Sequence, residues 1–219
     1  MASKSPFIVI DNFLTPLECE KVVERSFFNF PNEDADGRPI KSVTRNYATE
    51  DLVLERMDDI IDMMEEYYEY EHGGILPIDV EYYPERSVPE GTRCENALYN
   101  GKWMRVNDHD FTAVLFLKDD NMSTNFDDYY EVYGARLQFP NYNFSFHPQR
   151  GQLVIFPSSQ HFLNSVLPPS IGDLYQLRMQ FVGMKPHTFD PTKFPGNHTT
   201  WFKWVVVNYK KFPILCLTN

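Results

Sequence analysis

The chain has 219 residues and a formal net charge of −11 at pH 7. A nucleic-acid backbone or an anionic membrane would be repelled by that charge, so neither is expected as the main partner. Hydrophobic residues make up 42% of the chain, with 18 Phe and 13 Tyr, which excludes a disordered chain and favours one domain with a substantial core.

Cysteine usage and the N-terminus predict an intracellular protein. Cys19, Cys94 and Cys216 are an odd number of cysteines without a Cys-x-x-Cys spacing, so neither a disulfide framework nor structural zinc is expected. The apolar run near the N-terminus is too short for a signal peptide, and no run approaches the roughly 18 apolar residues of a membrane span.

The first 80 residues predict a short strand followed by a helical flank. Residues 6–13, Pro-Phe-Ile-Val-Ile-Asp-Asn-Phe, are typical of a short strand. Thr15 then has the features of an N-cap, with Pro16 in the first helical position and Glu18 completing a capping box. A helix of about ten residues is expected to follow.

A second helix is predicted over residues 51–70, packed on a sheet through one apolar face. That face is formed by Leu54, Met57, Ile61, Met64 and Tyr68, which recur at helical spacing with acids between them. Residues 72–74, His-Gly-Gly, are expected to end it. Residues 28–46, rich in turn formers and charges, predict a surface loop.

Residues 81–185 predict an antiparallel all-β core, so the fold class is mainly β with flanking helices (α+β). Four runs of β-branched and aromatic residues are separated by Gly, Pro and Asn, at residues 110–120, 133–139, 147–166 and 173–183. Residues 186–219 form an aromatic C-terminal extension, which is expected either to fold back on the domain or to dock against a partner.

These segments resemble the double-stranded β-helix, a jelly-roll or cupin-like core, of Fe(II)/2-oxoglutarate-dependent oxygenases. The likeness is to the prolyl-4-hydroxylase-like branch, including proteins encoded by marine phages. It covers roughly residues 7–184 and implies one oxygenase-like domain over residues 1–185. The matching positions are Thr112, Leu115, Phe116, Leu117, Gly134, Leu137, Phe139, Pro148, Gly151, Leu153, Phe156, Ser158 and His161.

The resemblance implies Fe(II) held by a His-x-Asp motif and a distal histidine, which leave open positions for 2-oxoglutarate and oxygen. It places Arg93 and Glu95 on the motif and His161 on the distal histidine. A guanidinium has no free lone pair and stays protonated, so Arg93 cannot ligate iron. Glu95 is one methylene longer than the Asp of the motif, which moves its carboxylate by roughly 1.5 Å. Metal–ligand distances vary by only about 0.2 Å. His109 is the candidate replacement ligand, and a polar loop histidine is the alternative.

Arg178 and Tyr83 are the candidate contacts for 2-oxoglutarate. The resemblance puts Leu174, which has no charge, where a basic residue usually holds the co-substrate. Arg178 follows on the same strand face and could bind a dicarboxylate through two hydrogen bonds. A structural salt bridge is the alternative role for Arg178. Arg93 and Arg178 could also form an anion site in the barrel mouth without iron.

Two functions remain open. The chain is either an active hydroxylase of a peptide or small molecule, with Fe(II) and 2-oxoglutarate as cofactors, or a non-catalytic member that uses the barrel as an interaction module. The altered positions 93 and 174 favour the second function. In that case we expect a component of a phage or virus particle, docked through the C-terminal extension, and located in the virion or the host cytoplasm. Oligomerisation is compatible with either function.

Overall fold

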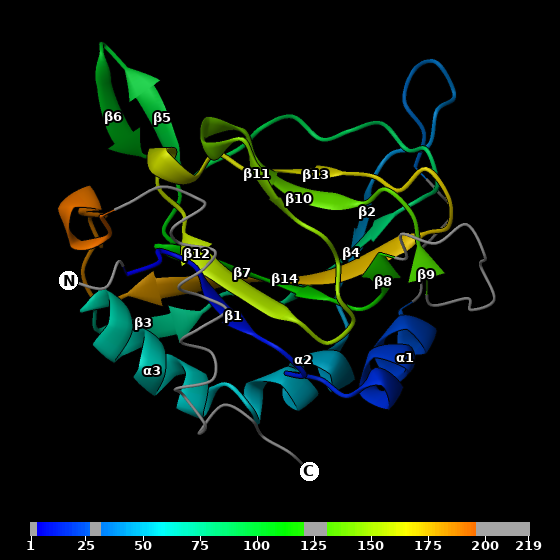
Figure 1. Cartoon of the computed structure of the whole chain (residues 1–219), viewed down its shortest axis with the longest axis horizontal. Coiled ribbons are helices and arrows are strands. Elements are labelled where there is room, and N and C mark those ends of the chain that lie inside the picture. The colour runs from blue at the N-terminus through cyan, green and yellow to red at the C-terminus, as the bar shows by residue number, and fades with distance from the viewer. Residues whose placement is uncertain (1–3, 27–31, 121–130, 196–219) are drawn as a thin grey trace.

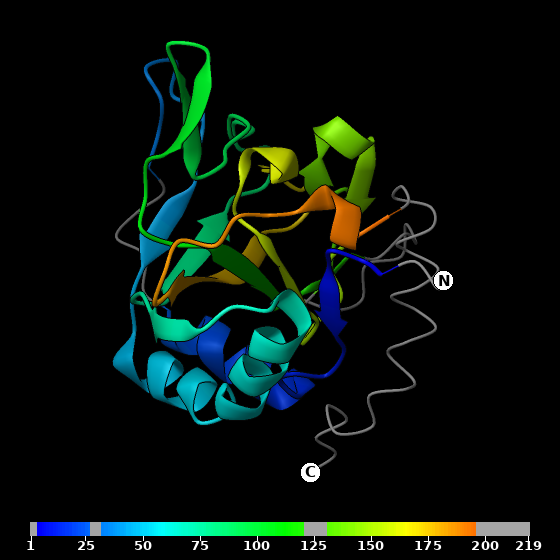
Figure 2. The ribbon, with the colours of Figure 1, turned by 90° about the vertical axis from the view of Figure 1, so that its left-hand side faces the viewer.

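Two antiparallel sheets face each other, and the helices cover the outer side of the larger sheet (Figures 1 and 2). The computed structural model describes residues 4–26, 32–120 and 131–195. The predicted fold class, mainly β with helices on one sheet, is confirmed. Sequence patterns identified it because runs of β-branched and aromatic residues between turn formers are typical of strands.

The larger sheet has the strand order β1-β12-β7-β14-β4-β2, and β3 also pairs with β14. Its strands are β1 (Ile8–Ile10), β2 (Ser42–Thr44), β3 (His72–Ile75), β4 (Asp79–Tyr83), β7 (Phe111–Phe116), β12 (Leu153–Pro157) and β14 (Leu174–Gly183). The smaller sheet has the order β11-β10-β13, with β10 (Arg136–Phe139), β11 (Phe144–Phe146) and β13 (Ser165–Leu167).

Two shorter pairings stand outside these sheets. A hairpin of β5 (Asn96–Tyr99) and β6 (Lys102–Arg105) projects from the body of the molecule (Figure 1). The short strands β8 (Asp119–Asp120) and β9 (Glu131–Val132) pair in parallel. Three 3₁₀ turns, η1 (Pro140–Tyr142), η2 (Gln160–Phe162) and η3 (Pro191–Lys193), connect elements within the described ranges.

The first predicted helix is confirmed as α1 (Pro16–Arg25), including its capping box. The Thr15 side chain accepts from the Glu18 backbone N–H, and the Thr15 backbone N–H donates to the Glu18 carboxylate. This reciprocal pair satisfies two donors that a helix start otherwise leaves without partners.

The single helix predicted over residues 51–70 is wrong, because the segment contains α2 (Tyr47–Leu54) and α3 (Asp58–Tyr68). Asn46 caps α2 by accepting from two backbone N–H groups. Between the helices, Arg56 turns inward to bond the Phe13 carbonyl and pair with Glu18. Glu69, in the left-handed conformation, ends α3. Residues 72–74, expected to stop the helix, begin β3 instead, and β2 lies in the predicted surface loop.

Aromatic rings fill the space between the two sheets. Phe7 is the centre of this cluster, with its ring 4.9 Å from that of Phe139, 5.5 Å from Phe146 and 5.6 Å from Phe162. Edge-to-face contacts of this kind stabilise a core beyond the burial of area alone. They attach the N-terminal segment to the smaller sheet and to η2.

The start of the predicted C-terminal extension packs on the domain. Phe189 and Phe194 are buried, and the Phe189 ring lies 4.8 Å from that of Phe162. Residues 196–219 lie outside the described residues, so the rest of the extension and Cys216 have no structural account. Within the described ranges Cys19 and Cys94 are free thiols. No helix in the described part of the chain is long and apolar enough to cross a membrane.

Gly151 joins the N-terminal segment to the larger sheet at a position that only glycine fits. Its carbonyl accepts from Phe13 N–H at 2.8 Å, and its N–H donates to the Phe116 carbonyl at 2.8 Å. Its φ is +80°, and a Cβ there would lie 2.1 Å from the Leu14 carbonyl oxygen. A side chain would therefore meet both backbone strain and a backbone atom.

We expect Gly151→Ala to lower the free energy of unfolding by about 3 kcal/mol or more, because the clash adds to the strain of a left-handed alanine. Gly37→Ala is the matched control, since Gly37 has φ +72° with nothing within 4 Å of the added carbon, and should cost about 1 kcal/mol. Urea unfolding of both variants measures the difference. Equal losses in the two variants would contradict the close approach to Leu14.

Candidate functional site: a buried charge network in the barrel mouth

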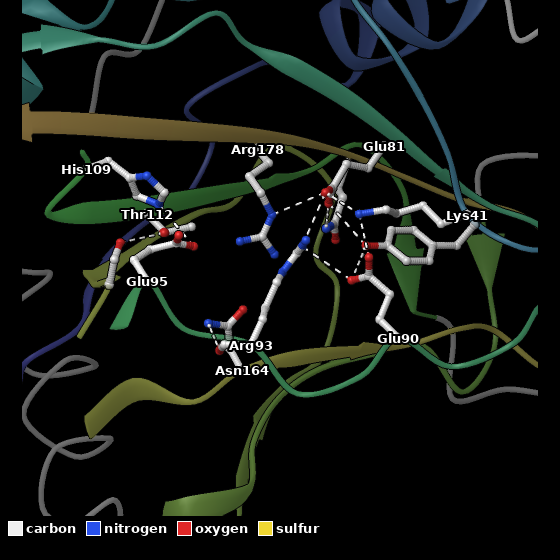
Figure 3. Close-up of polar contacts among 12 residues, drawn as sticks. Lys41, Glu81, Glu90, Arg93, Glu95, His109, Thr112, Asn164 and Arg178 are labelled. Carbon is white, nitrogen blue, oxygen red and sulfur yellow. Dashed lines mark hydrogen bonds and ion pairs between the residues drawn. The ribbon is translucent and has the colours of Figure 1, made fainter. Parts of the chain in front are cut away.

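The Glu81 carboxylate is the centre of the site, and it is buried on β4 with 2% of its side chain exposed. Its Oε1 atom lies 2.9 Å from Lys41 Nζ, 3.3 Å from Arg93 Nη2 and 3.3 Å from Arg178 Nε. Its Oε2 atom accepts from Gln176 Nε2 at 2.6 Å. Three cations therefore surround one buried carboxylate (Figure 3).

A second carboxylate, that of Glu90, completes the network. It pairs with Lys41 Nζ at 2.5 Å and with Arg93 Nη2 at 3.3 Å. The Tyr83 hydroxyl lies 3.0 Å from Glu90 Oε2 and 3.2 Å from Glu81 Oε2. The network thus joins the segment before β2, strand β4, the loop after β4 and strand β14.

The surroundings fix the ionisation of these groups. Burial alone would raise the pKa of Glu81, but Arg178, Arg93 and Lys41 outweigh it and hold that pKa far below its usual range. Burial likewise opposes the charge of Arg93, yet Glu81 and Glu90 raise its pKa. Burial raises the pKa of Tyr83, which stays a neutral hydroxyl. Glu81 is ionised and Arg93 protonated at neutral pH.

Glu95 and His109, two of the predicted metal ligands, lie together in the structure. Glu95 Oε1 is 3.2 Å from His109 Nε2, and Asn107 donates to the other oxygen. Burial opposes the charge of Glu95, but these hydrogen-bond donors and the nearby Arg178 lower its pKa. The Glu95 carboxylate is directed at His109 and Asn107 rather than at a shared centre with Arg93.

His161, the third predicted ligand, lies on η2 with its ring 5.5 Å from that of Phe189. It lines a cavity of about 270 Å³ that His109 and His187 also line. No group of three His, Cys, Asp or Glu side chains in the described part of the chain could hold a metal ion. Because Arg93 is also committed to two carboxylates, the residues present do not fit an iron site.

Asn164, rather than His161, lies opposite Arg93. The two backbones bridge through Arg93 N–H to Asn164 O at 2.8 Å and Asn164 N–H to Arg93 O at 2.9 Å. The Asn164 side chain donates to the Arg93 and Phe162 carbonyls. Sequence patterns did not single out Asn164, because histidine is the more familiar metal ligand, although Asn164 directly precedes β13.

The candidate co-substrate contacts are engaged with the chain's own acids. Arg178 is paired with Glu81, so the alternative of a structural salt bridge is present. The Tyr83 hydroxyl faces Glu81 and Glu90, and Leu174 is fully buried as the cross-strand partner of Tyr83. The signal for Glu81 was available, because it lies two residues before Tyr83 and so shares its strand face.

Solved structures that are similar to this chain include prolyl hydroxylases. A viral collagen prolyl hydroxylase from Paramecium bursaria Chlorella virus-1, in complex with 2-oxoglutarate, has a TM-score of 0.59 at 11% identity, covering 82% of this chain and 96% of its own. A Pseudomonas putida prolyl-4-hydroxylase has a TM-score of 0.58 at 15% identity, covering 81% and 92%.

A Trichoplax adhaerens prolyl hydroxylase, in complex with a hypoxia inducible factor peptide fragment, has a TM-score of 0.55 at 14% identity, covering 81% and 84%. Sequence-family models and curated proteins give no match. Identities this low show the fold alone. The chain therefore has the oxygenase-like, cupin-like fold of the prolyl hydroxylases.

Proposed function

We propose that this chain is a non-catalytic protein with an oxygenase-like fold, which uses its barrel as a binding module and does not hold iron. The observation that carries the proposal is the ion pairing of Arg93 with Glu81 and Glu90. A fixed guanidinium at the first ligand position supplies a positive charge where a divalent cation would require a lone pair.

The same network argues against 2-oxoglutarate turnover. A co-substrate carboxylate would have to displace Glu81, which has three cations and two further hydrogen-bonding groups around it. Leaving such a buried carboxylate without partners is strongly unfavourable. The alternative function, a hydroxylase with iron on His161, Glu95 and His109, would require these groups to leave their present contacts.

The exposed hairpin favours an interaction role over a purely structural one. Leu98, Tyr99, Trp103 and Met104 of β5 and β6 are each between 48% and 65% exposed. Large apolar side chains grouped on one projecting element are typical of a protein contact surface. A particle component or adaptor, docked through this hairpin or through the aromatic C-terminal extension, is the interaction role we propose.

Anaerobic calorimetry with Fe(II), with and without 2-oxoglutarate, tests the proposal. We expect no saturable heat at micromolar metal, and no succinate from a parallel turnover assay, because Arg93 repels the ion. The Pseudomonas putida enzyme, which has the same fold, is the control for both assays. Micromolar binding that 2-oxoglutarate strengthens would overturn the proposal.

Acid unfolding tests whether Glu81 is ionised inside the network. Its pKa in the folded protein lies below the ordinary value of 4.5, so its contribution to stability is complete above pH 4.5 and is lost as the pH falls below that value. We expect Glu81→Gln to lower the free energy of unfolding at pH 7 by about 3 to 5 kcal/mol, since three cations lose their carboxylate.

The variant should also lose less of its remaining stability than the parent protein between pH 4.5 and pH 3. Glu69→Gln is the control, because Glu69 pairs with Lys193 at the exposed surface and its removal should leave the acid unfolding curve nearly unchanged. A Glu81→Gln protein with parental stability and a parental acid limb would show that the carboxylate is not held ionised.

A further inference from the structure

Several buried polar side chains in and beside the charge network have atoms without hydrogen-bond partners among the described residues, and Arg178 and Asn164 are two of them. Arg178 is 5% exposed, and its Nε and Nη2 atoms have no hydrogen-bond partner among the described residues. The 3.3 Å contact from Nε to Glu81 is an ion pair without hydrogen-bond alignment. Asn164 is 3% exposed, and its Oδ1 atom is likewise unpaired in the described ranges. Buried atoms of this kind require a partner from outside the chain, which a bound ligand or water can supply.

The Arg178 and Asn164 side chains come from facing parts of the barrel mouth (Figure 3). Figure 3 shows the guanidinium of Arg178 and the side chain of Asn164 directed toward each other, with Arg93 beside them. Secondary structure holds the Arg178 donors and the Asn164 acceptor in place. Arg178 lies in β14 between β4 and β7, and the Asn164 backbone pairs with that of Arg93. The Arg93 side chain is 32% exposed, which leaves this side of the mouth open to solvent.

The guanidinium of Arg178 favours an anion as the ligand. Lys41, Arg93 and Arg178 contribute three positive charges to the mouth, and Glu81, Glu90 and Glu95 contribute three negative charges. The preference for an anion therefore comes from the unpaired end of the Arg178 guanidinium, which has the planar geometry that binds a carboxylate through two hydrogen bonds.

We propose that the barrel mouth binds a small hydroxycarboxylate between Arg178 and Asn164 without a metal ion. The carboxylate accepts hydrogen bonds at the Nη end of the Arg178 guanidinium, which includes the unpaired Nη2 and is directed toward Asn164, whereas Nε faces Glu81 (Figure 3). The ligand hydroxyl donates to Asn164 Oδ1. A hydroxyl is required because a carboxylate has no proton to offer that oxygen. The inference deepens the proposed function and rests on it, since the ligand occupies the mouth in place of iron.

Binding of lactate and of propionate, which differ by one hydroxyl, tests the assignment. In a buffer with EDTA, both are titrated into ¹⁵N-labelled protein while the side-chain signals of Arg178 Nε–H and Asn164 are followed by NMR. We expect saturable shifts for both ligands, with lactate about tenfold tighter, because propionate leaves the buried oxygen unpaired. A weak site would have a millimolar dissociation constant. The absence of a saturable shift up to about 10 mM lactate would therefore overturn the inference.

Three variants separate recognition from folding. Arg178→Lys keeps the charge beside Glu81 but loses the planar pair of donors, and should weaken both ligands about tenfold or more. Asn164→Ala should bind lactate and propionate equally, an effect that a purely structural role does not produce. Arg45→Lys is the matched control, because Arg45 is exposed and pairs with Asp79, and it should bind as the parent does.

The outcomes distinguish this inference from the proposed function. Unchanged binding in Arg178→Lys, or an unchanged lactate preference in Asn164→Ala, would refute the site even if the protein binds no iron. If Arg178→Lys does not fold, the Asn164→Ala preference decides. Lactate binding in EDTA together with micromolar Fe(II) binding in the calorimeter would keep this site and refute the non-catalytic function.

Discussion

The rest of the barrel mouth depends on the burial of one ionised carboxylate, that of Glu81. Removing a carboxylate from water is costly, and in a protein interior only close cations and hydrogen-bond donors offset that penalty. Lys41, Arg93 and Arg178 provide the cations here. Since they come from three separate parts of the chain, the pairing ties the edge of the larger sheet to the loop after β4 and to β14.

The same pairing decides what chemistry the fold can perform. A double-stranded β-helix that holds a divalent metal needs a mouth with excess negative charge and free lone pairs. In this chain Arg93 brings a positive charge to that position and is held there by two acids. Glu95 also has donors of its own, His109 and Asn107. Most of the charge in the mouth is therefore paired within the protein, and the unpaired end of the Arg178 guanidinium is suited to an anion rather than to a metal ion.

Much of the fold was predictable because its strands are short runs of β-branched and aromatic residues between clear turn signals. β7, β12 and β14 lie within the predicted runs, and the capping box located α1. The break between α2 and α3 was not predictable, because it depends on Arg56 reaching Phe13 and Glu18, 43 and 38 residues away. Local propensity carries no information about contacts at that separation.

The site shows the same division between local and distant information. Arg93 and Arg178 could be identified as unusual from the resemblance alone. Glu81 shares its strand face with Tyr83, but that pattern does not reveal its partners Lys41 and Gln176, which lie 40 and 95 residues away in the sequence. His161 was favoured by residue type, whereas the position opposite Arg93 belongs to Asn164. A ligand position is defined by which chain segments face each other. In this barrel the facing pair is an arginine and an asparagine, which together offer donors and an acceptor to an organic anion and a poor ligand set to iron.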